Sequence, residues 1–420
     1  MEQGYRTTRS KTTLFERRAL ISNRGCRMSA AKAFRNPSVP LPPSPPDVLV
    51  SRLDVTPAGP PRTDDSGLVG KMVAAVEAIQ GPRTQADGVF RDLLSNDSES
   101  CIAVGGHRGM GENLWNDDDP LNLPNLWREN TIKSFLKACQ YGITFVEFDV
   151  QVTKDDVPVI WHDDKMIFGS PFQPISCEVK DLTLQEFRSI GPRPIDKSGS
   201  LRELIPLQRD FTSRTTGRKI GEGRNMWQCF DDDQLPTFRE VCELMPEHVG
   251  LNVEVKMTTP DTVARTDPAE VDRVVSAVLD TLSDYLHTGG TSRKGPIVLS
   301  SFDPDVVLEL QKRQSDCRVM FITTGGASPH ANPLRMSPGA AIDFGSRNEL
   351  AGVVFDTSVL RKEPHWVRVG LEKGLKVLTY GLGNNDSEWV SEQSGMGVHA
   401  AIVDDVANML PVLVGKWSGR

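Results

Sequence analysis

Short apolar runs alternate with longer amphipathic stretches from Cys101 onward. This alternation is typical of repeated βα units on a parallel sheet, because the buried strands are apolar and each helix buries only one side. Eight runs have the length and β-branched content of strands: 101–107, 143–150, 249–255, 296–301, 317–323, 351–355, 375–380 and 399–403. Helices are expected at 130–140, 237–245, 268–286, 304–314, 361–373 and 405–414. Several of them follow residues that favour a helix N-cap, such as Asp303 or Asp404. Eight strands with helical crossovers predict an α/β fold, a (β/α)8 TIM barrel.

Two long segments interrupt the predicted barrel. Residues 110–128 follow the first strand and include three aspartates, Asp117 to Asp119. Residues 164–235 follow the second strand region. Because a structureless loop of that length is rare in a compact domain, they are predicted to form a small cap subdomain. The chain is thus expected to divide into residues 1–100 and a barrel domain at 101–420 that contains the cap.

The N-terminal segment is strongly basic. Residues 1–46 contain nine Lys or Arg against two Glu, a formal charge of +7, so the remainder of a chain with net charge -8 carries -15. A basic, Ser-rich segment that is poor in acids resembles an organelle transit peptide, and the alternative is a basic tail without an address. Nine prolines between Pro37 and Pro61 favour an extended linker. Residues 1–100 are therefore predicted to be disordered. The expected location is a plastid or another organelle, and otherwise the cytoplasm.

The composition argues against two kinds of partner. A body this acidic is unsuited to binding a nucleic-acid backbone. No stretch approaches the roughly 20 consecutive apolar residues that cross a bilayer, so no transmembrane segment is expected. The sequence predicts no particular oligomeric state.

Two carboxylates share one face of the second predicted strand. Glu147 and Asp149, in the sequence EFD, are two residues apart, and alternate residues of a strand point the same way. Like charges inside a barrel are costly unless a cation or a shared proton compensates them, and hard oxygen ligands suit Mg²⁺ or Ca²⁺. The alternative is a solvated pair at the end of a strand.

The third predicted strand adds a further row of polar groups. In NVEVK, Asn252, Glu254 and Lys256 alternate with valines and are expected to point into the barrel, where aliphatic side chains are usual. A divalent ion held by Glu147, Asp149 and Glu254, with Lys256 facing an anion, would satisfy them. A structural Glu254–Lys256 ion pair is the alternative.

Two histidines fall at the same predicted rim. His107 ends the first strand in GGHRG, beside Arg108, whose planar guanidinium suits phosphate oxygens. His162 follows VPVIW after the second strand. Two imidazoles, a phosphate-binding cation and three carboxylates together predict metal-assisted hydrolysis of a phosphodiester.

Several spaced motifs resemble one known family. In order along the chain they are GGHRG, RENTIKSF, FVEFDVQVTKDDVPVIWHDD, LPTFREV, LNVEVK, SSFDP and VLTYGLGNN. They resemble the glycerophosphodiester phosphodiesterase family, and its longer, plant-like eukaryotic members most, over about residues 101–415. The resemblance implies a TIM barrel with a small cap after the HD motif. It also implies hydrolysis of glycerophosphodiesters, such as glycerophosphocholine, to sn-glycerol 3-phosphate and an alcohol.

The resemblance further implies roles for nine residues. The acid and base would be His107 and His162. The ligands of a divalent cation, with Mg²⁺ expected ahead of Ca²⁺, would be Glu147, Asp149 and Glu254. The phosphate would be bound by Arg108 and Lys256, and the site supported by Glu129 and Asn130 of the ENT segment.

The chain departs from many bacterial members after the seventh strand. They have a tryptophan-containing WTVN-type motif there, whereas this chain has TYGLGNN, which places Tyr380 and Asn384 at the expected glycerol side of the site. Asp117 to Asp119 either steer a cationic choline head group or form a solvated acidic loop. Two other functions remain open, a lysophospholipase D that acts on acylated glycerophosphodiesters and a non-catalytic barrel that binds phosphodiesters.

Overall fold

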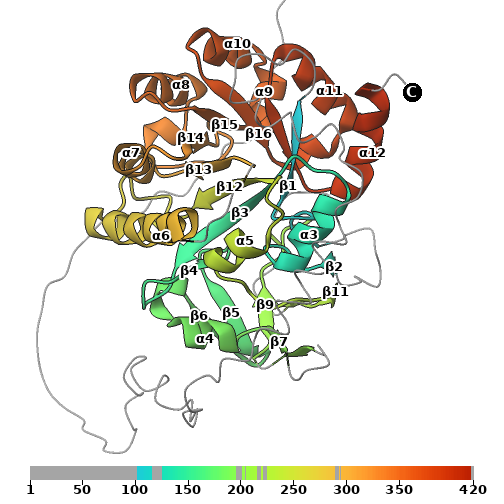
Figure 1. The fold of residues 1–420 in the computed structure, drawn as a ribbon, viewed down its shortest axis with the longest axis vertical. Coiled ribbons are helices and arrows are strands. Elements are labelled where there is room, and N and C mark those ends of the chain that lie inside the picture. The colour runs from blue at the N-terminus through green and yellow to red at the C-terminus, as the bar shows by residue number, and fades with distance from the viewer. Residues whose placement is uncertain are drawn as a thin grey trace, which may run out of the picture. The chain divides into compact units, whose positions relative to one another are not determined.

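The computed structural model describes residues 102–115, 125–194, 201–203, 205–214, 219–220, 225–288, 293 and 295–417. These residues form a closed barrel of parallel strands with helices around it (Figure 1). The predicted disordered region at residues 1–100 and the aspartates Asp117 to Asp119 lie outside the described residues.

Eight parallel strands close the barrel in the described part of the chain. Around the barrel they follow one another in sequence order, and the last strand, β17, pairs with the first, β1. Their bounds are β1 (Ala103–His107), β3 (Phe145–Val152), β12 (Gly250–Val255), β13 (Ile297–Ser301), β14 (Arg318–Thr323), β15 (Gly352–Asp356), β16 (Lys376–Tyr380) and β17 (Ala400–Val403). Every predicted strand is confirmed, with ends that differ by at most two residues.

The helices cover the outside of the barrel (Figure 1). They are α3 (Ile132–Gln140), α5 (Phe238–Leu244), α6 (Pro268–Thr288), α7 (Pro304–Arg313), α8 (Pro338–Arg347), α9 (Thr357–Lys362), α10 (His365–Glu372), α11 (Ser387–Met396) and α12 (Val406–Trp417), with short 3-10 turns η2 (Val179–Asp181), η3 (Pro333–Arg335) and η4 (Leu382–Asn385). The single helix predicted at 361–373 is wrong, because Pro364 separates α9 from α10. Two further helices, α8 and α11, begin after the N-caps Ser337 and Asp386 and were not predicted; each contains glycine, which is a poor helix former.

Alternate positions of each strand face the barrel interior and the outer helices. On β3, Phe145 packs with the interior side chains, whereas Phe148 packs against the helices, 5.5 Å from the ring of Phe135. Gly105 of β1 leaves the space that Phe145 fills, because a Cβ there would lie 2.2 Å from its ring. Glu147 and Asp149 alternate in step with Phe145 and therefore point inward, as predicted.

The insertion predicted at residues 164–235 contains a small cap with a core of its own. Its elements gather beside β4 and α5 (green in Figure 1). An antiparallel sheet has the order β10-β9-β5-β6, and buried aromatic side chains such as Trp161, Phe187 and Trp227 pack within the cap. The strand β4 (Pro158–Ile160) pairs with β3 at the barrel, and β2 (Asn125–Trp127) pairs with β11 of the cap. The bounds of the cap are β5 (Met166–Ser170), β6 (Gln173–Cys177), α4 (Leu184–Ser189), β7 (Pro192–Pro194), β8 (Leu201–Glu203), β9 (Leu207–Arg209), β10 (Asn225–Met226) and β11 (Cys229–Asp231).

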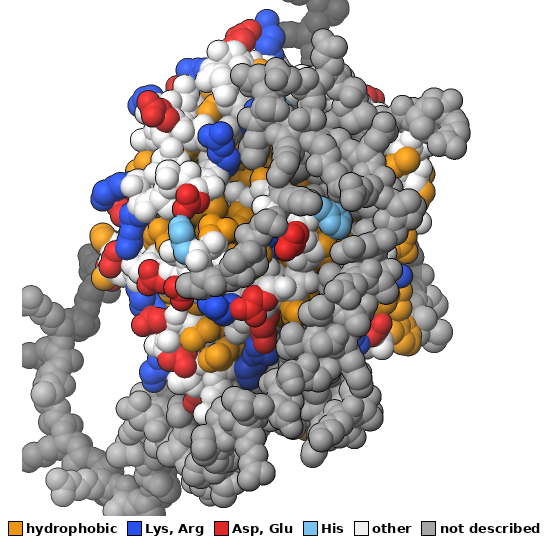
Figure 2. Space-filling view, in the orientation of Figure 1, with side chains coloured by type: hydrophobic (Ala, Val, Ile, Leu, Met, Phe, Trp, Pro, Cys, Tyr) orange, Lys and Arg blue, Asp and Glu red, His pale blue; other side chains and the backbone are white. Residues whose placement is uncertain are grey.

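Acidic and basic side chains are interspersed over the described surface that Figure 2 shows. Among the described helices, none has both the length and the apolar character required to cross a membrane.

Candidate active site

Neighbouring strands bring three predicted carboxylates together inside the barrel. Glu147 and Asp149 lie on β3, and the strand register aligns His107 of β1 with Glu147 and Glu254 of β12 with Asp149. One oxygen from each of the three carboxylates lies within 4.8 Å of the other two. The side chains predicted to be metal ligands are therefore close enough to share one cation.

Burial and mutual repulsion favour a proton on one member of this carboxylate cluster, Glu147. Burial, and then the charge of Asp149, raise the pKa of Glu147 to about 8. Burial also raises the pKa of Glu254. Burial alone would raise the pKa of Asp149 as well, but the nearby His162 and Lys256 lower it. A divalent cation bound to the three oxygens would replace the proton on Glu147, so the residues fit Mg²⁺ or Ca²⁺.

Two cations face the carboxylates, the buried Arg108 and the half-buried Lys256. Nζ of Lys256 lies 3.1 Å from Oε1 of Glu254 and 3.6 Å from Oδ1 of Asp149. Nη1 of Arg108 donates to Oε1 of Glu129 over 2.8 Å. Nε of Arg108 lies 3.4 Å from Oδ2 of Asp149, but it makes no hydrogen bond. Donors that suit phosphate oxygens therefore lie directly beside the proposed metal ligands.

The ENT segment before α3 holds the same carboxylates in place. Nδ2 of Asn130 donates to Oδ2 of Asp149 over 2.9 Å, and its backbone N–H donates to the carbonyl of Arg108 over 3.0 Å. Asn130 and Arg108 both have positive φ, +57° and +49°. Such backbone costs a residue other than glycine on the order of 1 kcal/mol or more. The contacts of the site therefore hold local strain at these two positions.

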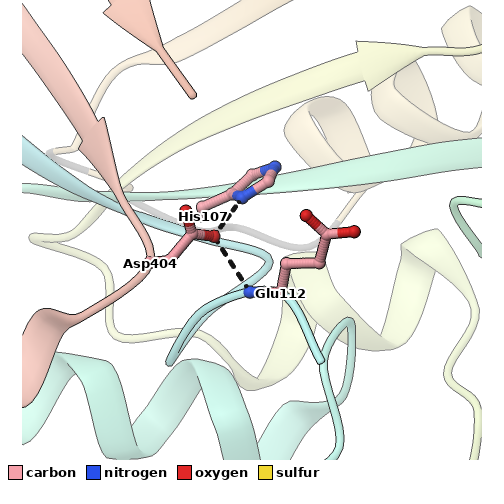
Figure 3. Close-up of side chains that lie close together, drawn as sticks. All are labelled: His107, Glu112 and Asp404. Atoms are coloured by element: carbon pink, nitrogen blue, oxygen red, sulfur yellow. Dashed lines mark hydrogen bonds and ion pairs between the residues drawn. The ribbon is translucent and has the colours of Figure 1, made fainter. Parts of the chain in front are cut away.

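His107 contacts an aspartate from the far end of the chain. Figure 3 shows its ring facing Asp404, with Nδ1 and Oδ1 2.6 Å apart. The same oxygen accepts the backbone N–H of Glu112 over 3.0 Å. Burial alone would lower the pKa of His107, but the charge of Asp404 raises it to about 9. His107 therefore carries a proton at neutral pH and is able to donate one.

His162 has the opposite protonation state. Its Nδ1 lies 2.8 Å from Oδ1 of Asp163. Burial, and then the charges of Arg108 and Lys256, lower the pKa of His162 to about 4. The ring is therefore neutral at neutral pH and is able to accept a proton.

The cap supplies a site residue that the sequence analysis did not identify. Arg209 of β9 donates to both carboxylate oxygens of Asp163, over 3.0 and 2.9 Å, and to Oε2 of Glu129 over 2.7 Å. Its side chain is only 3% exposed. Arg209 therefore connects the aspartate that holds His162 to the glutamate that holds Arg108.

Asp163 and Asp404 were also missed, although the sequence contained a signal for each. Asp163 belongs to the HDD segment, where only the histidine received a role. Asp404 has the position of a helix N-cap before α12 and was interpreted as one, whereas in the structure its carboxylate binds His107. No local pattern marks Arg209, because its partners come from three distant segments.

A second acidic group is a weaker candidate for a metal. Figure 3 shows this group, which consists of His107, Glu112 and Asp404. Each residue offers one possible ligand atom, and the three atoms lie within 4.8 Å of one another. Burial would raise the pKa of Asp404, but His107 lowers it to about 2, so this carboxylate is already compensated by a protonated imidazole. The three carboxylates on β3 and β12 therefore have the greater need of a cation.

The expectation that Asn384 lines the site is wrong. Asn384 is fully buried, where Nδ2 donates to the carbonyl of Ile402 over 3.0 Å and Oδ1 accepts from Gln393 over 2.9 Å. It stabilises the turn after β16 instead. Tyr380 packs edge-on against Phe302, with ring centroids 5.8 Å apart.

Comparisons with known proteins agree on one family. The model of the glycerophosphoryl diester phosphodiesterase family matches residues 107–408. Glycerophosphodiester phosphodiesterase GDPD2 of Arabidopsis thaliana is 33% identical over 310 residues, which cover 74% of this chain and 76% of the relative. Glycerophosphocholine phosphodiesterase GDE1 of Candida albicans is 32% identical over 348 residues, 77% of this chain but only 29% of that longer protein.

A solved structure supports the fold independently. The protein comes from Silicibacter pomeroyi and is assigned to the glycerophosphoryl diester phosphodiesterases. It superposes with a TM-score of 0.53 at 19% sequence identity, and the match covers 79% of this chain and 98% of that one. At this identity the likeness concerns the barrel architecture alone.

Proposed function

Because the chain belongs to the glycerophosphoryl diester phosphodiesterase family, we propose that its barrel hydrolyses glycerophosphodiesters to sn-glycerol 3-phosphate and an alcohol. One observation carries the proposal. The carboxylates Glu147, Asp149 and Glu254 converge within 4.8 Å, beside two cationic side chains and two imidazoles, a set of groups suited to phosphodiester hydrolysis.

The proposed chemistry follows from the positions of the side chains. Arg108 and Lys256 bind the phosphate oxygens and hold the phosphorus near the carboxylates. His162 takes the proton of the attacking nucleophile. The nucleophile is either water or the hydroxyl on the glycerol carbon next to the one that carries the phosphate. As the new P–O bond forms, the bond to the alcohol breaks, and His107 donates its proton to the departing oxygen. Where the glycerol hydroxyl attacks, water then opens the cyclic phosphodiester.

Glu147, Asp149 and Glu254 would hold one divalent cation, Mg²⁺ ahead of Ca²⁺. A cation there would neutralise the phosphodiester and polarise a P–O bond. Both ions accept carboxylate oxygens, and Mg²⁺ is the ion that usually retains water and binds through few carboxylates together with substrate phosphate oxygens.

The test is release of sn-glycerol 3-phosphate by the full chain from glycerophosphocholine and glycerophosphoglycerol, with EDTA, Mg²⁺ and Ca²⁺ compared. We expect metal-dependent release, and a fall of about 10²- to 10⁴-fold in kcat for His107→Ala and for His162→Ala. His287→Ala is the matched control, because His287 is exposed on the outer helix α6. Release of the alcohol and lysophosphatidate from lysophospholipids, with no cleavage of the deacylated substrates, would favour a lysophospholipase D. Binding without turnover for any ion would favour a non-catalytic barrel.

The basic N-terminal segment is the basis of a separate proposal on location. Its excess of Lys and Arg over acids supports an address to a plastid or another organelle. A fluorescent fusion of residues 1–60 that stays diffuse in the cytosol would contradict this proposal.

A further inference from the structure

A pocket of about 140 Å³ adjoins the proposed metal ligands. Its walls come from the ends of β12 and β13 and from the loops that follow β12, β13 and β14. Glu254 and Lys256 line it together with Phe302, His330 and Arg335. A phosphodiester held at Lys256 would therefore extend one of its two arms into this space.

Arg335 brings a positive charge to the pocket, where Asp261, Glu254 and Asp303 act on it from beyond ion-pair distance. Within the described residues, no Asp or Glu oxygen forms an ion pair with it, in contrast to the site residues Arg108 and Arg209. Its Nε is buried without a hydrogen-bond partner. The guanidinium therefore offers a donor that an oxygen atom of a ligand would satisfy.

His330 contacts Arg335 and also a carboxylate, because its Nε2 lies 3.6 Å from Oδ1 of Asp261. Its side chain is only 6% exposed. Nδ1 faces the backbone N–H of Asn332 at 2.9 Å, and Nε2 faces Nη1 of Arg335 at 2.8 Å. A neutral imidazole has one acceptor nitrogen and a protonated one has none. At least one of these contacts therefore lacks an acceptor, and a ligand oxygen near Arg335 would supply it.

Arg335 also occupies the aromatic surface of the pocket. Its Cζ lies 5.0 Å from the centroid of the Phe302 ring, which also makes a T-shaped contact with Tyr380. A quaternary ammonium group binds to the faces of aromatic rings. Here a guanidinium already takes that position and would repel a second cation.

The acidic residues of the pocket, Asp261, Glu254 and Asp303 among them, offset this charge only in part. Asp303 caps α7 and also accepts a hydrogen bond from Thr266. The side chain of Asp261 is 70% exposed, and Asp164 is exposed as well, so water and salt screen both charges.

We propose that this pocket binds the alcohol arm of the substrate and selects an arm that is rich in hydroxyl or carboxylate oxygens over a quaternary ammonium. Arg335 is the residue that determines this specificity, with His330 as its partner. The inference rests on the proposed function and adds the class of alcohol that is released.

The test compares kcat/KM of the full chain with Mg²⁺ for glycerophosphoinositol, glycerophosphoglycerol and glycerophosphocholine. The wild type should prefer the two polyol substrates by about tenfold, the scale of one cation–aromatic contact. Arg335→Met should reduce this preference by about tenfold, because the donors are lost and the ring of Phe302 is freed. Arg335→Lys retains the charge and should still discriminate against the choline substrate.

Arg361→Met is the matched control. Arg361 stacks on Trp389 at 4.9 Å on the outer helices α9 and α11, so its loss removes a similar contact away from the pocket. Its three kcat/KM values should stay within about twofold of the wild type. Thermal unfolding of each variant shows whether the fold is retained.

Several outcomes would overturn the inference. A wild type that prefers glycerophosphocholine tenfold contradicts it even if the Arg335 variants do not fold. An equal loss for all three substrates in Arg335→Met would place the shared glycerol arm in the pocket and would overturn it too. A wild type that hydrolyses none of them would overturn the proposed function as well, whereas an active wild type with an unchanged preference in Arg335→Met overturns this inference alone.

Discussion

Asp404 and His107 are 297 residues apart in the sequence, yet their Oδ1 and Nδ1 atoms lie 2.6 Å apart (Figure 3). They meet because β17 pairs with β1 where the barrel closes. The contact leaves Nε2 of His107 facing the carboxylates, 3.9 Å from Oε2 of Glu147. Closure of the barrel therefore orients the histidine that we propose to be the acid.

Asp404→Asn should lower kcat by about 10²- to 10⁴-fold, because an amide neither holds the imidazolium charge nor fixes the ring tautomer. KM should change by less than about threefold, since Asp404 makes no proposed contact with substrate. Steady-state kinetics check both values. Asp405→Asn is the matched control, because Asp405 bonds instead to Asn408. A folded Asp404→Asn variant with the wild-type kcat would contradict the proposed role.

Glu254→Gln should weaken binding of a divalent ion at least about tenfold, whereas Glu112→Gln should leave it nearly unchanged. The two glutamates belong to the two competing acidic groups, and only the group of Glu254 has a buried carboxylate with a strongly raised pKa, that of Glu147. Electron paramagnetic resonance of Mn²⁺ measures the affinity without turnover. The opposite order of effects would move the metal to the side of His107.

Metal binding at pH 7 should release a proton. Glu147 has a pKa of about 8 in the metal-free site, so it is largely protonated at pH 7 and must ionise to bind a cation. The affinity should therefore increase with pH up to about 8 and then level off. Calorimetry in buffers with different ionisation enthalpies counts the protons. An affinity that is constant between about pH 6 and 8 is not compatible with this prediction.

Arg209→Met should impair both stability and turnover. The change removes one of the two cations of the buried Glu129 and the guanidinium of the half-buried Asp163, which costs about 3–5 kcal/mol in unfolding free energy, and it loosens the aspartate that holds His162. Chemical denaturation and kcat measure the two effects.

Arg128→Met is the matched control for Arg209. Arg128 stacks on the same Trp227 ring, at 4.8 Å against 4.4 Å for Arg209, but pairs with Asp232. The Arg128→Met variant should be less stable than the wild type, while its kcat remains close to the wild-type value. If both variants lower kcat equally, Arg209 acts only through the stability of the cap.

Strand periodicity accounts for what could be predicted of the site. Glu147, Asp149 and Glu254 alternate with buried apolar residues, so their inward direction was evident before the structure. The break between α9 and α10 and the buried position of Asn384 were predicted wrongly. Pro364 ends the helix because proline lacks a backbone N–H, although the apolar pattern continues beyond it. The hydrogen-bond partners of Asn384 lie on β16, β17 and α11, which are distant in the sequence.

The sequence by itself determined the eight strands, their order and the polar residues that face the interior, because a period of two and short apolar runs are local properties. Only the tertiary structure decided which charges meet. Barrel closure pairs His107 with Asp404, and the fold of the cap brings Arg209 to Asp163 and Glu129. These contacts set the pKa values of the site, because burial and neighbouring charges act through space and not along the chain.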